Sequence, residues 1–174
     1  MAEEQRLADD AAAAVIEKEK KETEFWNLVR DSAENALKGN GDLVRAEENL
    51  SEYRREYPDG KHFVEANGKL AEVIKFKEEK IGKIVDGLKA DADKMFDAGE
   101  ARAAAGMLRE YSGEFAKESE GMRKILAEEI ESREKRLNME RAEKERAEAK
   151  TISEAAGDLR EMLRKGDLKG AGVS

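Results

Sequence analysis

The stretch that decides the fold is GDLVRAEENLSEYRREYP, residues 41–58, because a related stretch, GEARAAAGMLREYSGEFA, follows at residues 99–116. The two match without a gap at an offset of 58 residues, and a third copy begins with GDLKGA, residues 166–171. An internal repeat of this kind predicts an array of similar structural units. The positions that define the repeat are Gly41, Ala46, Leu50, Tyr53 and Pro58, then Gly99, Ala104, Leu108 and Tyr111, then Gly166 and Ala171.

Helix-breaking residues divide the rest of the chain at regular places, namely residues 38–42, 58–60, 97–100 and 165–167, with a weaker cluster at residues 112–121. Between these breaks, apolar residues recur at spacings of three and four, and the alternation typical of strands is absent. The pattern predicts an all-α protein. We expect long helices at about residues 2–38, 61–97 and 118–165, and short helices at about residues 42–57 and 100–115.

Alternating long and short helices predict tandem helical hairpins that form an elongated array of small three-helix bundles. We expect a first helical-repeat unit with an extended N-terminal helix at residues 1–80 and a second unit at residues 81–134. Residues 135–174 are expected to form a charged linking helix and the start of a truncated third repeat, so that the natural chain continues. Gly82 and Gly87 lie near the junction of the two units, where they could bend the linking helix.

The first copy of the repeat resembles the second half of a tetratricopeptide repeat at Gly41, Asp42, Ala46, Leu50, Tyr53 and Pro58. In that family a Gly-Asp turn precedes a helix that carries a small residue, then large ones, and ends at a proline. The ending REYPDGKHFVEA is similar to the variant found in bacterial envelope lipoproteins. The resemblance implies a non-catalytic scaffold that binds a protein or peptide, and it favours the bacterial cell envelope over the cytoplasm.

The sequence departs from the family pattern in three ways. Arg30 and Glu34 stand where the first helix of the family carries an aromatic residue and a glycine, and Ala116 replaces the proline in the second copy. The period of 58 residues also exceeds the usual length of about 34.

Composition excludes several classes of function. Charged residues make up 43% of the chain and aromatic residues 5%, with a net charge of −8, so we expect no binding of nucleic acid. Because the chain has no cysteine, it has neither a disulfide framework nor a thiolate metal site. The N-terminal residues 1–21 contain only a short apolar patch between charged flanks, so we expect neither a signal peptide nor membrane insertion.

No residue pattern predicts catalysis, a cofactor or a metal, and we expect no enzyme. His62 is the only histidine and lacks acidic companions at a local spacing that would make it a catalytic base or a metal ligand. The segment DADKMFDAGE, residues 91–100, faintly resembles a calcium loop. However, Met95 occupies the position of a ligand, and the residue pattern predicts a helix there.

Phe25 and Trp26 form the most aromatic site in the chain and are the candidate partner-binding residues. An exposed aromatic pair is typical of an interaction hot spot, whereas a buried pair simply fills the core, and the sequence leaves both interpretations open. Two functions also remain open. One is a protein-interaction or scaffold module; the other is a rod-like structural spacer or coiled-coil segment of a larger, membrane-anchored protein, with a homodimer through the long helices as a further alternative.

Overall fold

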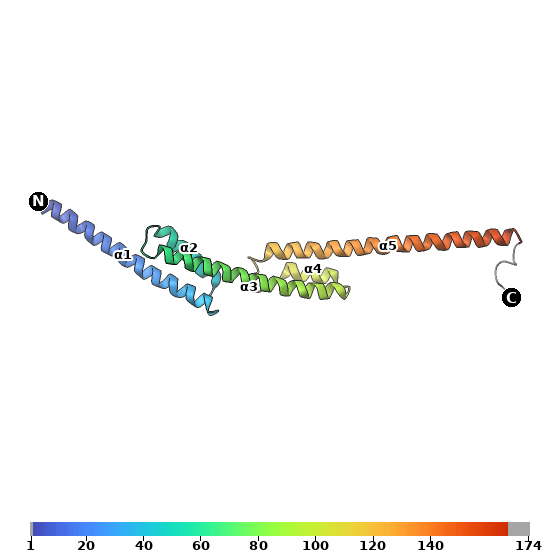
Figure 1. Cartoon of the computed structure of the whole chain (residues 1–174), viewed down its shortest axis with the longest axis horizontal. Coiled ribbons are helices and arrows are strands. Elements are labelled where there is room, and N and C mark those ends of the chain that lie inside the picture. The colour runs from blue at the N-terminus through green and yellow to red at the C-terminus, as the bar shows by residue number, and fades with distance from the viewer. Residues whose placement is uncertain (1, 167–174) are drawn as a thin grey trace. The chain divides into compact units, whose positions relative to one another are not determined.

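The computed structural model describes residues 2–166, which form five α-helices and no strand, so the predicted all-α class is confirmed. The helices are α1 (Ala2–Leu37), α2 (Leu43–Glu56), α3 (Phe63–Asp97), α4 (Ala101–Glu110) and α5 (Glu120–Arg164) (Figure 1). The predicted alternation of long and short helices is observed, and α3 continues through Gly82 and Gly87 without a break.

The helix α4 is shorter than predicted, because it ends at Glu110 rather than near residue 115. Turns occupy most of the segment from Gly113 to Ser119. Within it, Phe115 is buried and has a φ of 54°, the only positive φ of a non-glycine residue in the described part of the chain. The helix ends because Tyr111 is extended, with φ −55° and ψ 124°, and apolar periodicity does not report a change in backbone conformation.

The chain divides into two compact units, Met1–Ile84 and Val85–Ser174. The first contains α1, α2 and the start of α3, and the second contains the end of α3, then α4 and α5. The boundary lies inside α3, so this helix contributes its longer first part to the first unit and its shorter last part to the second.

The core of the first unit is made by one face of each of its helices. Trp26, Leu50 and Tyr53 are its largest fully buried side chains. Small residues separate them and allow the helix backbones to approach closely. The other buried apolar residues of this core are Val29, Ala33, Ala36, Leu43, Ala46, Ala66, Leu70, Val73 and Ile81.

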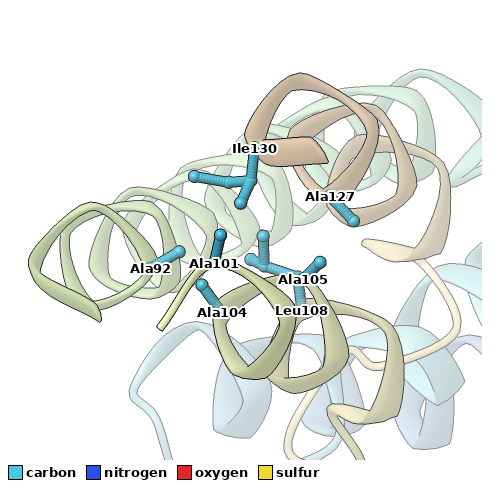
Figure 2. Close-up of a cluster of buried hydrophobic side chains, with 7 residues drawn as sticks. All are labelled: Ala92, Ala101, Ala104, Ala105, Leu108, Ala127 and Ile130. Atoms are coloured by element: carbon cyan, nitrogen blue, oxygen red, sulfur yellow. The ribbon is translucent and has the colours of Figure 1, made fainter. Parts of the chain in front are cut away.

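The core of the second unit consists mostly of alanine. Ala101, Ala104 and Ala105 of α4 face Ala127 and Ile130 of α5, with Leu108 beside them (Figure 2). Ala92 joins this cluster from α3. Because alanine side chains are short, α4 lies close to its neighbours, and partly buried residues fill the remaining space: Leu88, Met95, Phe96, Met107 and Leu126.

Ion pairs between helices lie around both cores. In the first unit Lys77 of α3 pairs with Glu47 of α2. In the second, Asp93 of α3 accepts from Arg133 of α5 at 2.5 Å, and Arg109 of α4 forms two hydrogen bonds with Glu131 of α5. These bonds lower the pKa of the Glu131 carboxyl below its usual value.

The C-terminal ends of the three long helices share the same backbone geometry, more closely than the sequence match suggested. Gly39 and Gly99 have φ values of 82° and 84°, and their amides donate to carbonyls three residues earlier, at 3.0 and 2.9 Å. In both cases the next amide donates to the carbonyl five residues before it, which completes a Schellman motif. Gly166 has a φ of 74° and also donates three residues back, to Leu163.

This geometry corrects the equivalence of Gly41 with Gly99. The residue that ends α1 in the left-handed conformation is Gly39, and Gly41 lies two residues later in the link. The carboxylate of Asp42 then caps α2 by accepting from the amides of Val44 and Arg45 at 2.9 and 3.1 Å. The first link is therefore longer than the second, which the ungapped match of the short helices concealed.

The turn Pro58-Asp59-Gly60 connects α2 to α3, as the sequence predicted. The amide of Gly60 donates to the carbonyl of Tyr57 at 3.1 Å. A Cβ atom on Gly60 would lie 2.6 Å from Oε1 of Glu22 and 2.9 Å from Cβ of Tyr57. The turn therefore lies directly against α1, and only glycine leaves enough space.

We predict that Gly60→Ala lowers the free energy of unfolding by about 1–3 kcal/mol, because the added methyl group displaces the Glu22 carboxylate or the turn. Chemical denaturation followed by circular dichroism measures the change. The matched control is Gly68→Ala, where a Cβ meets nothing within 4 Å, and it should stabilise the helix by about 0.5–1 kcal/mol. Equal effects of the two substitutions would contradict the steric role of Gly60.

Candidate functional site

Trp26 lies in the core of the first unit rather than on its surface. Its side chain is 1% exposed and stacks on the ring of His62, with centroids 5.3 Å apart and an interplanar angle of 10°. The ring of Tyr53 packs against it at 5.1 Å. An interaction hot spot requires an accessible side chain. The structure therefore supports the core-packing interpretation of Trp26.

Phe25 is half-buried at the edge of the same cluster. Its ring lies 6.0 Å from the ring of Tyr53 and 6.2 Å from that of Tyr57. These distances are typical of aromatic packing, so Phe25 extends the cluster toward the surface. His62 supplies the stacking partner of Trp26, and its ring Nδ1 lies 3.6 Å from Glu65.

The residues that define the repeat have mostly structural positions. Ala46 and Ala104, and likewise Leu50 and Leu108, are fully buried at equivalent places in the two short helices. The two tyrosines differ, since Tyr53 is fully buried whereas Tyr111 is half-buried. Gly41 and Pro58 lie in exposed links, and Gly166 follows α5. Ala171 lies outside the described residues.

A buried hydrogen bond that the sequence did not indicate anchors α2 to α1. The hydroxyl of Tyr53 donates to Oε1 of Glu22 at 2.7 Å, and Glu22 is only 8% exposed. Burial, followed by the hydrogen bond to the Glu22 carboxylate, raises the pKa of Tyr53 above its ordinary value. Glu22 lies four residues before Trp26, on the buried face of α1, and that spacing was the one available signal.

We predict that Tyr53 makes the stability of the protein fall at alkaline pH. Unfolded tyrosine releases its proton near pH 10, whereas folded Tyr53 retains it, so its contribution is complete below about pH 10 and declines as the pH rises further. At pH 7, Tyr53→Phe should lower the free energy of unfolding by about 1–3 kcal/mol, because Glu22 loses its donor. Chemical denaturation of the wild type and of Tyr53→Phe, at pH 7 and above pH 10, measures the difference in free energy of unfolding between the two proteins. A difference that does not shrink above pH 10 would contradict the assignment.

Arg123 is the buried cation of the second unit, at 4% exposure. Its guanidinium donates to the carbonyls of Leu108 and Ala116 at 2.5 Å and to the hydroxyl of Ser119 at 3.1 Å. It also lies over the ring of Tyr111, 5.3 Å from the centroid. Leu108 belongs to the last turn of α4, where carbonyls lack helical partners and the helix dipole is negative. Arg123 therefore caps α4 from α5.

We predict that Arg123→Met lowers the free energy of unfolding by about 2–4 kcal/mol, since it leaves carbonyl groups at the end of α4 without donors. Arg123→Lys should restore only part of the loss, because one ammonium group cannot reproduce the planar fork. Chemical denaturation measures both. Arg136→Met, at an exposed position of α5, is the matched control and should change stability by less than about 0.5 kcal/mol. A similar loss in the control would contradict the capping role.

Within residues 2–166, no group of three or more histidine, aspartate or glutamate side chains is arranged to hold a metal ion. In the same range, no helix has the length and hydropathy needed to cross a membrane. The buried side-chain nitrogen and oxygen atoms described there all have hydrogen-bond partners. The buried polar residues Glu22, Ser119 and Arg123 are thus used within the fold.

The longest fully exposed stretches of helix are the N-terminal half of α1 and the C-terminal half of α5. Every described side chain from Glu3 to Lys21 is exposed, and so are nearly all from Lys135 to Arg164. Each half nevertheless has an apolar face, and in α1 the exposed Ile16 is a further apolar residue outside that face. The α1 face consists of Leu7, Ala11, Ala14 and Val15, and the α5 face of Ile152, Ala155, Leu159, Met162 and Leu163.

Each of these faces continues a buried face of the same helix. In α1, steps of three and four residues lead along one face from the exposed Leu7 to Glu22, Trp26 and Val29. These last three residues are buried. In α5 the face of Arg123, Ala127 and Ile130 leads on to Ile152 and the residues after it. The two exposed faces are therefore positioned to pack as their buried continuations do.

No family model matches the chain, and neither a curated protein nor a solved structure does. The resemblance to tetratricopeptide repeats accordingly stays a prediction.

Proposed function

We propose that the protein is a non-catalytic helical-repeat interaction module that holds another polypeptide through the α1 face and the α5 face. The observation that carries the proposal is the exposure of these apolar faces beside two closed cores. Leu7 and Val15 are 66% and 56% exposed, and Ile152 and Leu159 are 69% and 49% exposed. Clustered apolar side chains of this kind are typical of interaction surfaces.

The mode of binding that follows is helix packing rather than insertion into a groove. The aromatic residues that could line a groove, Trp26 and Tyr53, are buried within the first unit. An apolar stripe on a helix is instead recognised by another amphipathic helix, which supplies its own side chains at spacings of three and four. The expected partner is therefore a helical protein segment.

A second candidate function, that of a structural spacer, is favoured by the charged middle of α5. Residues 138–151 are nearly all exposed, and acidic and basic side chains alternate along them. Such a segment is stable as a solvated helix with pairs at i and i+4, as between Lys150 and Glu154 at 3.8 Å. At about 1.5 Å per residue, these fourteen residues span about 20 Å between the second core and the α5 face.

We predict that a photo-reactive amino acid at position 159 crosslinks to a defined partner in cells that make the protein at its native level. The same amino acid at position 154, on the opposite side of α5, is the matched control and should give no adduct. Mass spectrometry of the adducts measures the result. Equal adducts at the two positions would contradict the interaction module, and no adduct at either position would favour the spacer.

A further inference from the structure

Residues 82–91 are the part of α3 that no core holds. All ten of them are half-buried or exposed, and they form the longest run in α3 without a buried side chain. The last buried residue before this run is Ile81, in the first unit, and the first one after it is Ala92, in the core of the second unit. We call residues 82–91 the α3 junction.

Side-chain bonds between helices are likewise found on either side of the α3 junction. Before it, Lys77 pairs with Glu47 of α2, and after it, Asp93 pairs with Arg133 of α5. Within the α3 junction, the ion pair of Asp91 is made to Lys94 of α3 itself. Neither buried packing nor an ion pair to another helix therefore stabilises these turns.

The α3 junction contains two glycines, Gly82 and Gly87, and the boundary between the two units falls between them, after Ile84. Neither glycine serves close packing, because a Cβ atom on either would meet nothing within 4 Å, and neither has a positive φ. Glycine weakens a helix because its backbone loses more freedom on folding than that of alanine. Each glycine therefore makes opening of its turn about fivefold more frequent than alanine would.

A glycine weakens α3 in this way only where the helix is not held by a core. Gly68 is also open, since a Cβ atom on it would meet nothing within 4 Å. It lies between the buried Ala66 and Leu70, so its turn is fixed against the first core. After Gly82, by contrast, the next buried side chain is that of Ala92. The two junction glycines thus combine low helix propensity with the absence of a core.

We propose that the α3 junction is a hinge whose helical turns open while both cores stay closed, which frees the angle between the two units. Opening breaks backbone hydrogen bonds of a few turns and exposes only the half-buried Ile84, Val85 and Leu88. It therefore requires much less free energy than unfolding of either unit. A hinge of this kind serves an interaction module and a spacer alike, so it does not rest on the proposed function.

Hydrogen exchange of the backbone amides, measured by NMR, tests whether the α3 junction opens by itself. The protection factors of amides 83–91 should be lower than those of amides 66–73 by roughly tenfold or more. In Gly82→Ala/Gly87→Ala the protection of amides 83–91 should rise about twentyfold, since each alanine contributes about fivefold. Gly68→Ala is the matched control in the same helix. It should leave these protection factors unchanged, because the junction opens without unfolding of the first core.

A proline in the α3 junction tests whether the cores survive its opening. Gly87→Pro removes the amide of residue 87 and prevents a continuous helix there. The fluorescence of Trp26, the only tryptophan, should stay as in the wild type, because the first core remains closed. Gly68→Pro is the matched control, and it should unfold the first core because its turn is packed there.

Distances between spin labels test whether opening frees the angle between the units. Because the chain has no cysteine, Ser51→Cys in α2 and Ala103→Cys in α4 place one label on an exposed residue of each unit. Pulsed electron paramagnetic resonance should give a broad distance distribution in the Gly87→Pro background and a narrow one in the Gly82→Ala/Gly87→Ala background.

Any one of four results would overturn the hinge. They are amides 83–91 as protected as amides 66–73, equal gains in their protection from Gly68→Ala and from the double alanine variant, loss of the first core in Gly87→Pro, and equal distance distributions in the two labelled backgrounds. None of these results changes the adduct expected at position 159, so failure of the hinge and failure of the proposed function are distinguishable.

Discussion

The close approach of helices at buried alanines is the constraint on which the rest of the structure depends. A chain with 43% charged residues has few large apolar side chains, and it reaches dense packing by bringing backbones together at Ala33, Ala36 and Ala46 in one unit and at Ala101, Ala104 and Ala127 in the other. A larger side chain at any of these positions would separate the helices and open the core around it. The short helices consequently bury an alanine and a leucine at equivalent positions in both units, Ala46 with Leu50 and Ala104 with Leu108.

The two units have the same helix pattern, but different side chains hold the short helix in each. The first unit surrounds its short helix with aromatic rings and closes it with the bond from Tyr53 to Glu22. The second has alanines and Leu108 at its centre, and it closes its short helix with the buried cation of Arg123. Equivalent positions in a repeat can therefore keep the same backbone geometry while the groups that hold the helix end differ completely.

Much of the fold could be predicted from the sequence because helix breakers and apolar spacing are local signals. They located four of the five helices within about two residues at each end, and they placed Ala46, Ala104, Leu50 and Leu108 at equivalent positions. The early end of α4 and the equivalence of Gly39 with Gly99 were missed, since both depend on backbone conformation. Glu22 and Arg123 were missed because charged residues are so common here that a buried one has no distinctive pattern. The exposure of Trp26 could not be decided either, because it depends on contacts with Tyr53 and His62, which are distant in the sequence.

The cap that Arg123 provides also has a consequence for the order in which the second unit acquires structure. The helix α4 has ten residues, which is too short to be stable in water by itself, and the donors for its last carbonyls lie on α5, about fifteen residues later in the chain. A ribosome must therefore release the first turns of α5 before α4 persists. We therefore expect α4 and the first turns of α5 to become stable together, because the donors for the last carbonyls of α4 are on α5.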